Sequence, residues 1–169
     1  NGNMTDRINQ NGDSWTYSWN IENKMDTATD GSDTVRFVYD ADGFLIQRLE
    51  NEGQPTETDT ISLGKLYEHE RNGNKKTKHY TFGGLMVARS VQGNVQYMVT
   101  DHLGTPTLVL NTNGAVSFKQ RMDAWGNERF TQNTDQNGFR YTGQRYDDTL
   151  GLHDYNARYY DSEIGRFLS

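Results

Sequence analysis

The sequence predicts an all-β fold, an antiparallel ribbon of short hairpins. Three observations predict it: dense Asn-Gly and Asp-Gly turn signals, short segments with apolar residues at every second position, and an internal repeat of about 20 residues. No window of a dozen residues carries an apolar stripe with the 3.6-residue period of a helix. The chain is therefore expected to consist of strands and corners.

Turn signals punctuate the chain at intervals that leave room for a strand on either side. Because Asn, Asp and Gly tolerate positive φ, we expect type I′ turns at these hairpin tips. The turn dipeptides are Asn11-Gly12, Asp30-Gly31, Asp42-Gly43, Asn72-Gly73, Asn113-Gly114 and Asn137-Gly138.

Strands are expected between the turns. Apolar residues alternate with polar ones from Trp15 to Ile21, from Val35 to Tyr39 and from Val95 to Val99, which is typical of a strand with one buried face. Residues 49–60 contain Gly and Pro and show no period, so we expect a loop there.

The repeat unit is about one hairpin long. Residues 19–25 align without gaps on residues 39–45, an offset of 20, and residues 1–4 align on residues 22–25, an offset of 21. Each copy couples an aromatic or apolar residue, an Asp or Asn, and a Gly or Asn a few positions on. Looser copies are Thr100–Gly104, Met122–Gly126, Tyr146–Gly151 and Tyr160–Gly165.

The recurring trio of residue types makes a corner. The ring packs on the sheet, the short carboxylate or amide accepts hydrogen bonds from backbone N–H groups two residues on, and Gly or Asn adopts the left-handed conformation. Corners joined by strands give a quasi-one-dimensional ribbon in which each unit contacts mainly its neighbours.

Charge and composition exclude several classes of protein. With 17 Lys and Arg against 23 Asp and Glu, the net charge of −6 argues against a nucleic-acid-binding surface. The absence of Cys excludes disulfides, thiolate metal sites and thiol nucleophiles. Neither a signal peptide nor a run of about 18 apolar residues is present, so no membrane insertion is expected. Leu, Ile, Val and Phe make up only 31 of 169 residues. This predicts a thin hydrophobic core whose stability depends on contacts with neighbouring chain.

Motifs spread over the whole chain carry a resemblance to a known family. They are Tyr80–Arg89, Thr100–Pro106 and above all Tyr146–Leu152 followed by Ala157–Ser169. These segments resemble Rhs/YD-repeat proteins, specifically their repeat-associated core. The C-terminal 24 residues are the most specific part of the match.

This resemblance implies a ribbon that spirals into part of a hollow β-shell. It implies that residues 1–145 are YD-repeat ribbon and that residues 146–169 are the core-associated segment that starts a plug. The implied function is structural encapsulation and delivery of a C-terminal polymorphic toxin by an exported effector of bacterial competition, or a role at the cell surface. The implied partners are the rest of the shell, the toxin cargo and a secretion-system spike or chaperone. No cofactor is implied.

The family also contains an aspartyl self-protease that frees the cargo. Its Arg corresponds to Arg158 here, whereas both of its Asp residues would lie beyond Ser169. Because the carboxylate pair is the physical requirement of this chemistry, these 169 residues are expected not to be an enzyme. Arg158 would assist cleavage only with the downstream acids attached.

The residues with the strongest predicted roles are structural. The resemblance implies that the C-terminal ones form a turn that redirects the ribbon towards the cleavage site: Asp147, Gly151, Arg158, Tyr159, Tyr160, Asp161, Gly165 and Arg166. Asp101, His102 and Gly104 are predicted as structural residues of another corner.

Sharper functional interpretations of the same residues remain open. His69, His79, His102 and His153 lack the close spacing of a metal site, so none is predicted, and His102 is expected to hydrogen-bond backbone in its turn. Asp147 and Asp161 could be paired acids, but two copies of one corner do not provide two different environments. The rings Trp15, Tyr17, Trp19 and Tyr39 could form a glycan-binding surface of an adhesion module, although packing between strands is favoured. Residues 75–79 could bind anions, although a solvated strand edge is favoured.

Overall fold

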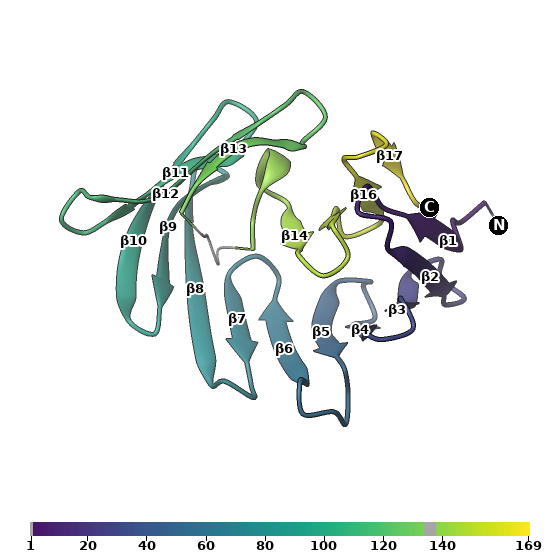
Figure 1. The fold of residues 1–169 in the computed structure, drawn as a ribbon. Coiled ribbons are helices and arrows are strands. Elements are labelled where there is room, and N and C mark those ends of the chain that lie inside the picture. Colours follow the sequence, from purple (N-terminus) through teal and green to yellow (C-terminus); the bar gives the residue numbers. More distant parts are fainter. Residues whose placement is uncertain (1, 134–137) are drawn as a thin grey trace. The chain divides into compact units, whose positions relative to one another are not determined.

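The computed structural model describes residues 2–133 and 138–169 and consists almost entirely of antiparallel β-structure. Among these residues there are seventeen β-strands and a single 3₁₀ turn, η1 (Tyr141–Gly143), and no α-helix (Figure 1). None of the described residues forms a helix that is long and apolar enough to cross a membrane. The all-β prediction is confirmed.

The chain divides into two compact units. The first comprises residues 1–76, 156–159 and 167–169, and the second comprises residues 77–155 and 160–166. Residues near the C-terminus are therefore shared between the two units.

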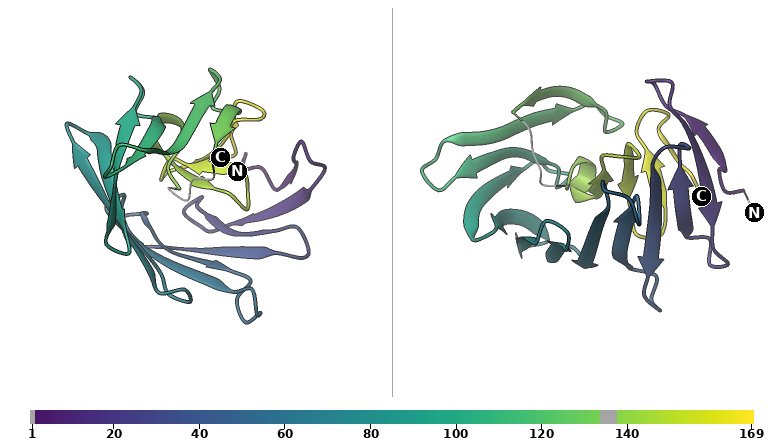
Figure 2. Two further views of the ribbon diagram at one scale, coloured as in Figure 1. Left: turned by 60° about the vertical axis from the view of Figure 1, so that its left-hand side comes forward. Right: turned by 60° about the horizontal axis from the view of Figure 1, so that its bottom comes forward.

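Consecutive antiparallel strands build the first unit, each paired with the next in chain order (Figures 1 and 2). Its buried face carries Trp15 and Tyr17 from β2, and Val35 and Phe37 from β4, at the expected spacing of two. Ile21 departs from the prediction: it lies beyond the end of β2 and is fully exposed. The strands are β1 (Asp6–Ile8), β2 (Ser14–Trp19), β3 (Met25–Thr29), β4 (Thr34–Tyr39), β5 (Leu45–Glu50), β6 (Thr58–Leu63) and β7 (Tyr67–Glu70).

The strands from β8 to β13 form a second run of consecutive antiparallel pairs. A hydrophobic cluster of Met86, Met98, Val109, Phe118 and Phe139 forms the core of the second unit. The strands are β8 (Lys75–Phe82), β9 (Leu85–Val91), β10 (Asn94–Thr100), β11 (Pro106–Asn111), β12 (Val116–Met122) and β13 (Glu128–Gln132).

Strand β10 was correctly predicted, but its burial was not. Val95, Tyr97 and Val99 are exposed, and Met98 on the opposite face enters the core. The period-two pattern locates the strand, but a strand with apolar residues on both faces does not reveal which face is buried.

The C-terminal segment adds four short strands. β14 (Arg145–Asp147) pairs antiparallel with β15 (Leu152–Asp154), and they are followed by β16 (Tyr159–Asp161) and β17 (Arg166–Phe167). Within the first unit, the Tyr159 ring lies 5.5 Å from the ring of Phe37, and the Leu168 carbonyl accepts a hydrogen bond from the Met4 N–H at 2.7 Å. The end of the chain is thus packed against its first hairpins.

The hairpin tips at the predicted Asn-Gly and Asp-Gly dipeptides differ from the expected type I′ turns. Only one described residue of each of these turns has positive φ, for example Gly12 (+89°), Gly43 (+81°) and Gly114 (+82°), whereas a type I′ turn needs two. At the Asn72-Gly73 turn the positive φ belongs to Asn74. These tips are longer turns with a single left-handed residue near their end. Two other links have positive φ at both residues, Gly83-Gly84 between β8 and β9 and Gln92-Gly93 between β9 and β10. Two predictions involve residues outside the described part of the chain: the turn at Asn137-Gly138 includes Asn137, and the first repeat copy begins at Asn1.

The loop predicted at residues 49–60 is shorter than expected. β5 extends to Glu50 and β6 begins at Thr58, so residues 51–57 form the connection. Its backbone closes through hydrogen bonds from Gln54 N–H to the Asn51 carbonyl and from Glu57 N–H to the Gln54 carbonyl.

Candidate functional site at the C-terminal corners

A five-residue corner is the structural unit from which the candidate site is built. At Asp101 the carboxylate Oδ1 accepts hydrogen bonds from the N–H groups of Leu103 and Thr105, both at 2.9 Å. The Gly104 N–H donates to the Asp101 carbonyl at 3.0 Å, and Gly104 has a φ of +85°. The predicted division of labour between carboxylate and glycine is therefore observed at this position.

The corner beginning at Asp123 has the same construction. Its Oδ1 accepts from the N–H groups of Trp125 at 2.8 Å and Asn127 at 3.0 Å. Although burial acts to raise it, the pKa of Asp123 is lowered overall because these N–H groups favour the charged form. The carboxylate is an ionised turn cap and has no proton to exchange near neutral pH.

Asp147 and Asp161 are both buried and both cap turns. Asp147 Oδ1 accepts from the N–H groups of Thr149 and Leu150, each at 3.1 Å, and Asp161 Oδ1 accepts from the N–H of Glu163 at 2.8 Å. The two carboxylates make the same kind of contact. This geometry gives no basis for dividing them into a catalytic acid and base.

A cluster of tyrosine rings surrounds His153 in the second unit. The His153 ring lies 4.7 Å from that of Tyr146, 6.1 Å from Tyr141 and 6.2 Å from Tyr160. The residue is 1% exposed, and its two ring nitrogens have no hydrogen-bond partner among the described residues. Burial, reinforced by the charge of Arg140, lowers the pKa of His153 to about 4, so the imidazole is neutral at pH 7.

Two tyrosine hydroxyls of this cluster hold the corner that begins at Asp123. The Tyr160 hydroxyl donates to the Trp125 carbonyl at 2.8 Å, and the Tyr141 hydroxyl donates to the Ala124 carbonyl at 2.7 Å. Burial raises the pKa of Tyr160, so this donor keeps its proton at neutral pH. The backbone of the corner is therefore fixed on the side of the tyrosine cluster.

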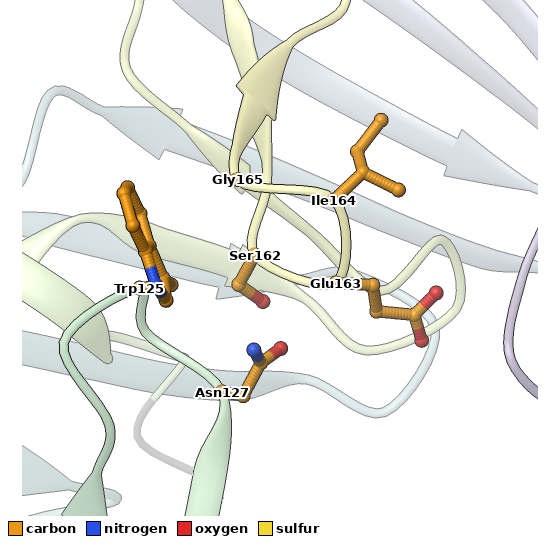
Figure 3. A pocket seen from close by; sticks show the side chains of 6 residues that line it. All are labelled: Trp125, Asn127, Ser162, Glu163, Ile164 and Gly165. Atoms are coloured by element: carbon orange, nitrogen blue, oxygen red, sulfur yellow. The ribbon is translucent and has the colours of Figure 1, made fainter.

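A pocket of about 210 Å³ lies beside this corner, within the second unit. Figure 3 shows the Trp125 ring on one side of it, with Ser162 beside the ring and the side chains of Ser162 and Asn127 pointing towards one another. Gly165 lies against the ring, because a Cβ built on it would be 3.4 Å from Cε3 of Trp125. The pocket is lined by Trp125, Asn127, Ser162, Glu163, Ile164 and Gly165.

Arg158 belongs to the first unit. Its guanidinium carbon is 4.0 Å from the centre of the Phe167 ring, a cation–π contact. Tyr159 next to it is buried, and its carbonyl accepts a hydrogen bond from the Leu168 N–H at 2.9 Å. The region around Arg158 is thus ordered by the segment that ends the chain.

Four further residues named in the sequence analysis have the following places in the structure. Gly151 and Gly165 have positive φ, and Arg166 is exposed at the start of β17. His102 is exposed and makes no hydrogen bond to the described residues, so the expected backbone contact is not seen there. In the described part of the chain no group of three or more acidic or His side chains is placed to hold a metal ion.

The rings considered as a glycan-binding surface are occupied by packing. Trp15 and Tyr17 are each 3% exposed, and the Trp19 indole N–H donates to the Met4 carbonyl at 2.8 Å. The favoured interpretation, packing between strands, agrees with these contacts. Of the three Trp side chains, Trp125 is the exposed one, at 62%.

Sequence reasoning missed the pocket and the tyrosine cluster. Trp125 was recognised only as the aromatic member of a corner, and Asn127, Ser162 and His153 carried no signal of their own. One feature of the sequence could have indicated the pocket. Trp125 and Glu163 both occupy the third position of a corner, where the backbone N–H, and not the side chain, bonds the carboxylate at the first position.

Comparisons with known proteins agree on one kind of structure. The family model described as Teneurin YD-shell matches residues 62–169. The chain is 33% identical over 165 residues to the tRNA3(Ser)-specific nuclease WapA of Bacillus spizizenii, covering 92% of this chain and 7% of that protein. It is 26% identical over 137 residues to the toxin protein Tse5 of Pseudomonas aeruginosa, covering 78% of this chain and 10% of that protein.

Solved structures show the same fold. A crystal structure of TcdB2-TccC3 superimposes with a TM-score of 0.75 at 19% identity, covering 92% of this chain and 9% of that one. The predicted fold class, an antiparallel hairpin ribbon of the YD-shell type, is confirmed. The chain spans a tenth or less of the length of each of these proteins.

Proposed function

Because the chain belongs to the teneurin YD-shell family, we propose that it forms part of the wall of an Rhs-type shell that encloses a C-terminal toxin and helps to deliver it. Its resemblance to Rhs/YD-repeat proteins is confirmed by the family match. Toxin-associated relatives such as Tse5 support a shell-like, toxin-related role. The action of this chain is steric, and the nuclease named for the Bacillus relative belongs to a protein of which the chain matches 7%.

The observation that carries the proposal is the return of the C-terminal segment to the first hairpins. Residues 156–159 and 167–169 belong to the first compact unit although residues 77–155 separate them from the rest of it in the sequence. Tyr159 and Leu168 are buried there, and Lys24 Nζ donates to the Asn156 carbonyl at 2.7 Å. A segment held on a ribbon in this way is suited to begin a plug.

In this proposal residues 1–145 are the ribbon and residues 146–169 begin the plug. Asp147, Gly151, Asp161 and Gly165 make its turns, Tyr159 and Tyr160 pack it, and Arg166 lies at its exposed end; Asp101, His102 and Gly104 form a corner of the ribbon. The partners are the rest of the shell, the toxin cargo and a secretion-system spike or chaperone. The protein carrying this chain is exported or held at the cell surface.

Protection of the cargo tests the proposal. In the complete gene product, residues that follow the shell are expected to resist proteinase K in the wild type and to be digested in Tyr159→Ala, since this variant removes the ring that packs on Phe37. Tyr97→Ala is the matched control, because Tyr97 is 51% exposed. Equal digestion of the cargo in the wild type and in Tyr159→Ala would contradict the proposal.

Self-cleavage is a second role for the parent protein, tied to Arg158. The stacking of its guanidinium on Phe167 supports it, because this contact fixes a cation close to the place where the family's acids would follow. A protein extended past Ser169 is expected to cut itself, and Arg158→Ala is expected to prevent the cut. An extended protein that stays whole with Arg158 present contradicts this role and leaves encapsulation standing.

A further inference from the structure

We propose that the pocket beside Trp125 binds a single pyranose ring of a neutral carbohydrate. This site is independent of the shell proposal, because it depends only on side chains that two corners bring together. The two corners are residues 123–127 and 161–165, and both lie in the second unit.

The aromatic wall of the pocket is suited to the apolar face of a sugar. Trp125 is 62% exposed, although indole is among the side chains that folding buries most readily. The C–H groups on one face of a pyranose pack against a flat aromatic ring, and the ring's N–H remains available for a hydroxyl. Among the described residues the Trp125 indole N–H has no hydrogen-bond acceptor.

Two neutral hydrogen-bonding groups complete the site. Ser162 has a hydroxyl that can donate and accept, and no described residue bonds to it. The Asn127 Nδ2 donates a hydrogen bond to Asp123 Oδ2 at 3.2 Å, which orients the side-chain amide. The side-chain oxygen Oδ1 of Asn127 can then accept a hydrogen bond from a sugar hydroxyl. Figure 3 shows both side chains directed to the same space beside the Trp125 ring.

The arrangement favours a neutral ligand over a cationic one. In Figure 3 the Glu163 carboxylate points away from Trp125 and Ser162, so a Lys or Arg side chain stacked on the indole would not meet it. The volume is about 210 Å³, below the roughly 300–1,000 Å³ of pockets for larger ligands. A volume of this size suits one sugar ring rather than a sugar chain.

The site is held in place before a ligand arrives. The Tyr160 hydroxyl fixes the Trp125 carbonyl, the Asp123 carboxylate holds the Trp125 and Asn127 N–H groups, and Gly165 supports the indole from the other corner. A preorganised site loses less conformational entropy on binding, which raises the affinity for a small ligand.

Titration with methyl glycosides tests the proposal. The 169-residue chain is titrated with methyl β-D-glucopyranoside, methyl β-D-galactopyranoside and N-acetyl-D-glucosamine, with saturation-transfer NMR and tryptophan fluorescence as readouts. We expect at least one of them to bind with a low-millimolar Kd, as suits a ligand of about a dozen non-hydrogen atoms. A trisaccharide of the sugar that binds is then titrated in the same way. Tighter binding of the trisaccharide than of the monosaccharide would identify the ligand as the end of a sugar chain, and equal binding would identify it as a free monosaccharide.

Variants locate the binding. Trp125→Ala is expected to weaken it more than about tenfold and Ser162→Ala, which removes one hydroxyl, about threefold to tenfold. Tyr97→Ala, an exposed ring on β10 outside the pocket, is expected to leave it unchanged. Trp125→Phe keeps a ring in place if the alanine variant fails to fold, as judged by circular dichroism, and is expected to retain weakened binding.

Three results would overturn the proposal. One is that no sugar of the panel binds at any soluble concentration. Another is that binding survives in folded Trp125→Ala and Ser162→Ala. The third is that Nα-acetyl-lysine amide binds in a Trp125-dependent way and the glycosides do not, which would assign the pocket to a cationic side chain.

Discussion

Replacing Gly126 by alanine is expected to destabilise the second unit far more than the same change at Gly114. Both glycines are the left-handed residue of a turn, with φ of +91° and +82°. At Gly114 an added Cβ meets nothing within 4 Å. At Gly126 it would lie 2.6 Å from Cγ and Cδ1 of Tyr141, a distance at which the ring must move.

The magnitude follows from these contacts. Backbone strain alone lowers the free energy of unfolding by about 1–2 kcal/mol for each variant. At Gly126 the crowding of a packed ring adds roughly 1–3 kcal/mol. Displacement of Tyr141 also breaks the bond from its hydroxyl to the Ala124 carbonyl, now 2.7 Å long, which contributes about 1 kcal/mol. The two variants are therefore expected to differ by roughly 2–4 kcal/mol.

Urea unfolding followed by tyrosine and tryptophan fluorescence measures both values. A double variant supplies the internal control: in a Tyr141→Ala background the ring is gone and only the Cβ at position 141 remains, 3.0 Å from the added carbon, so Gly126→Ala should lower the free energy of unfolding by less than in the otherwise wild-type chain. Equal destabilisation by Gly126→Ala and Gly114→Ala in the otherwise wild-type chain would refute the reasoning.

Further predictions concern burial and charge. The pKa of His153 is about 4 in the folded chain against 6.5 for the free side chain. Its contribution of about 3 kcal/mol to the free energy of unfolding is therefore present above pH 6.5 and is lost as pH falls towards 4. His153→Phe should remove this pH dependence, as measured by urea unfolding. A double-mutant cycle of Phe37→Ala and Tyr159→Ala should give a coupling free energy of about 0.5–1.5 kcal/mol, and additivity would contradict the ring contact. Asp59→Asn, at a buried acceptor, should lower the free energy of unfolding by about 1–3 kcal/mol. Glu52→Gln, at an exposed ion pair, should lower it by less than about 1 kcal/mol in the same thermal or urea assay.

Local chemistry made most of the fold predictable. The alignment of residues 19–25 on 39–45 places Asn23 where the second copy has Gly43, and both have positive φ, +59° and +81°. A corner can be predicted from sequence because its hydrogen bonds join residues no more than four positions apart. The type I′ expectation was wrong for the same local reason, since the carboxylate or amide at the first position bonds two N–H groups and extends the turn.

Burial and the site depend on contacts that sequence patterns do not encode. Val95, Tyr97 and Val99 form as regular a stripe as Val35 and Phe37, yet the first stripe is exposed and the second is core. The choice is made by what lies on each face, which for β10 is a cluster including Phe139, about 40 positions away in sequence. The pocket has the same origin, because Trp125 and Ser162 meet only after the chain has folded.

The corner motif explains how one repeated unit could serve both the proposed wall and the proposed sugar site. Its first residue accepts hydrogen bonds from backbone N–H groups, and its fourth or fifth residue provides the positive φ. At Leu103 and Trp125 the third residue donates its backbone N–H to the carboxylate, and its side chain takes no part in these hydrogen bonds. Leu103 is 49% exposed and Trp125 62% exposed. The Trp125 ring can therefore form one side of the proposed site without a change in the hydrogen bonds of its turn.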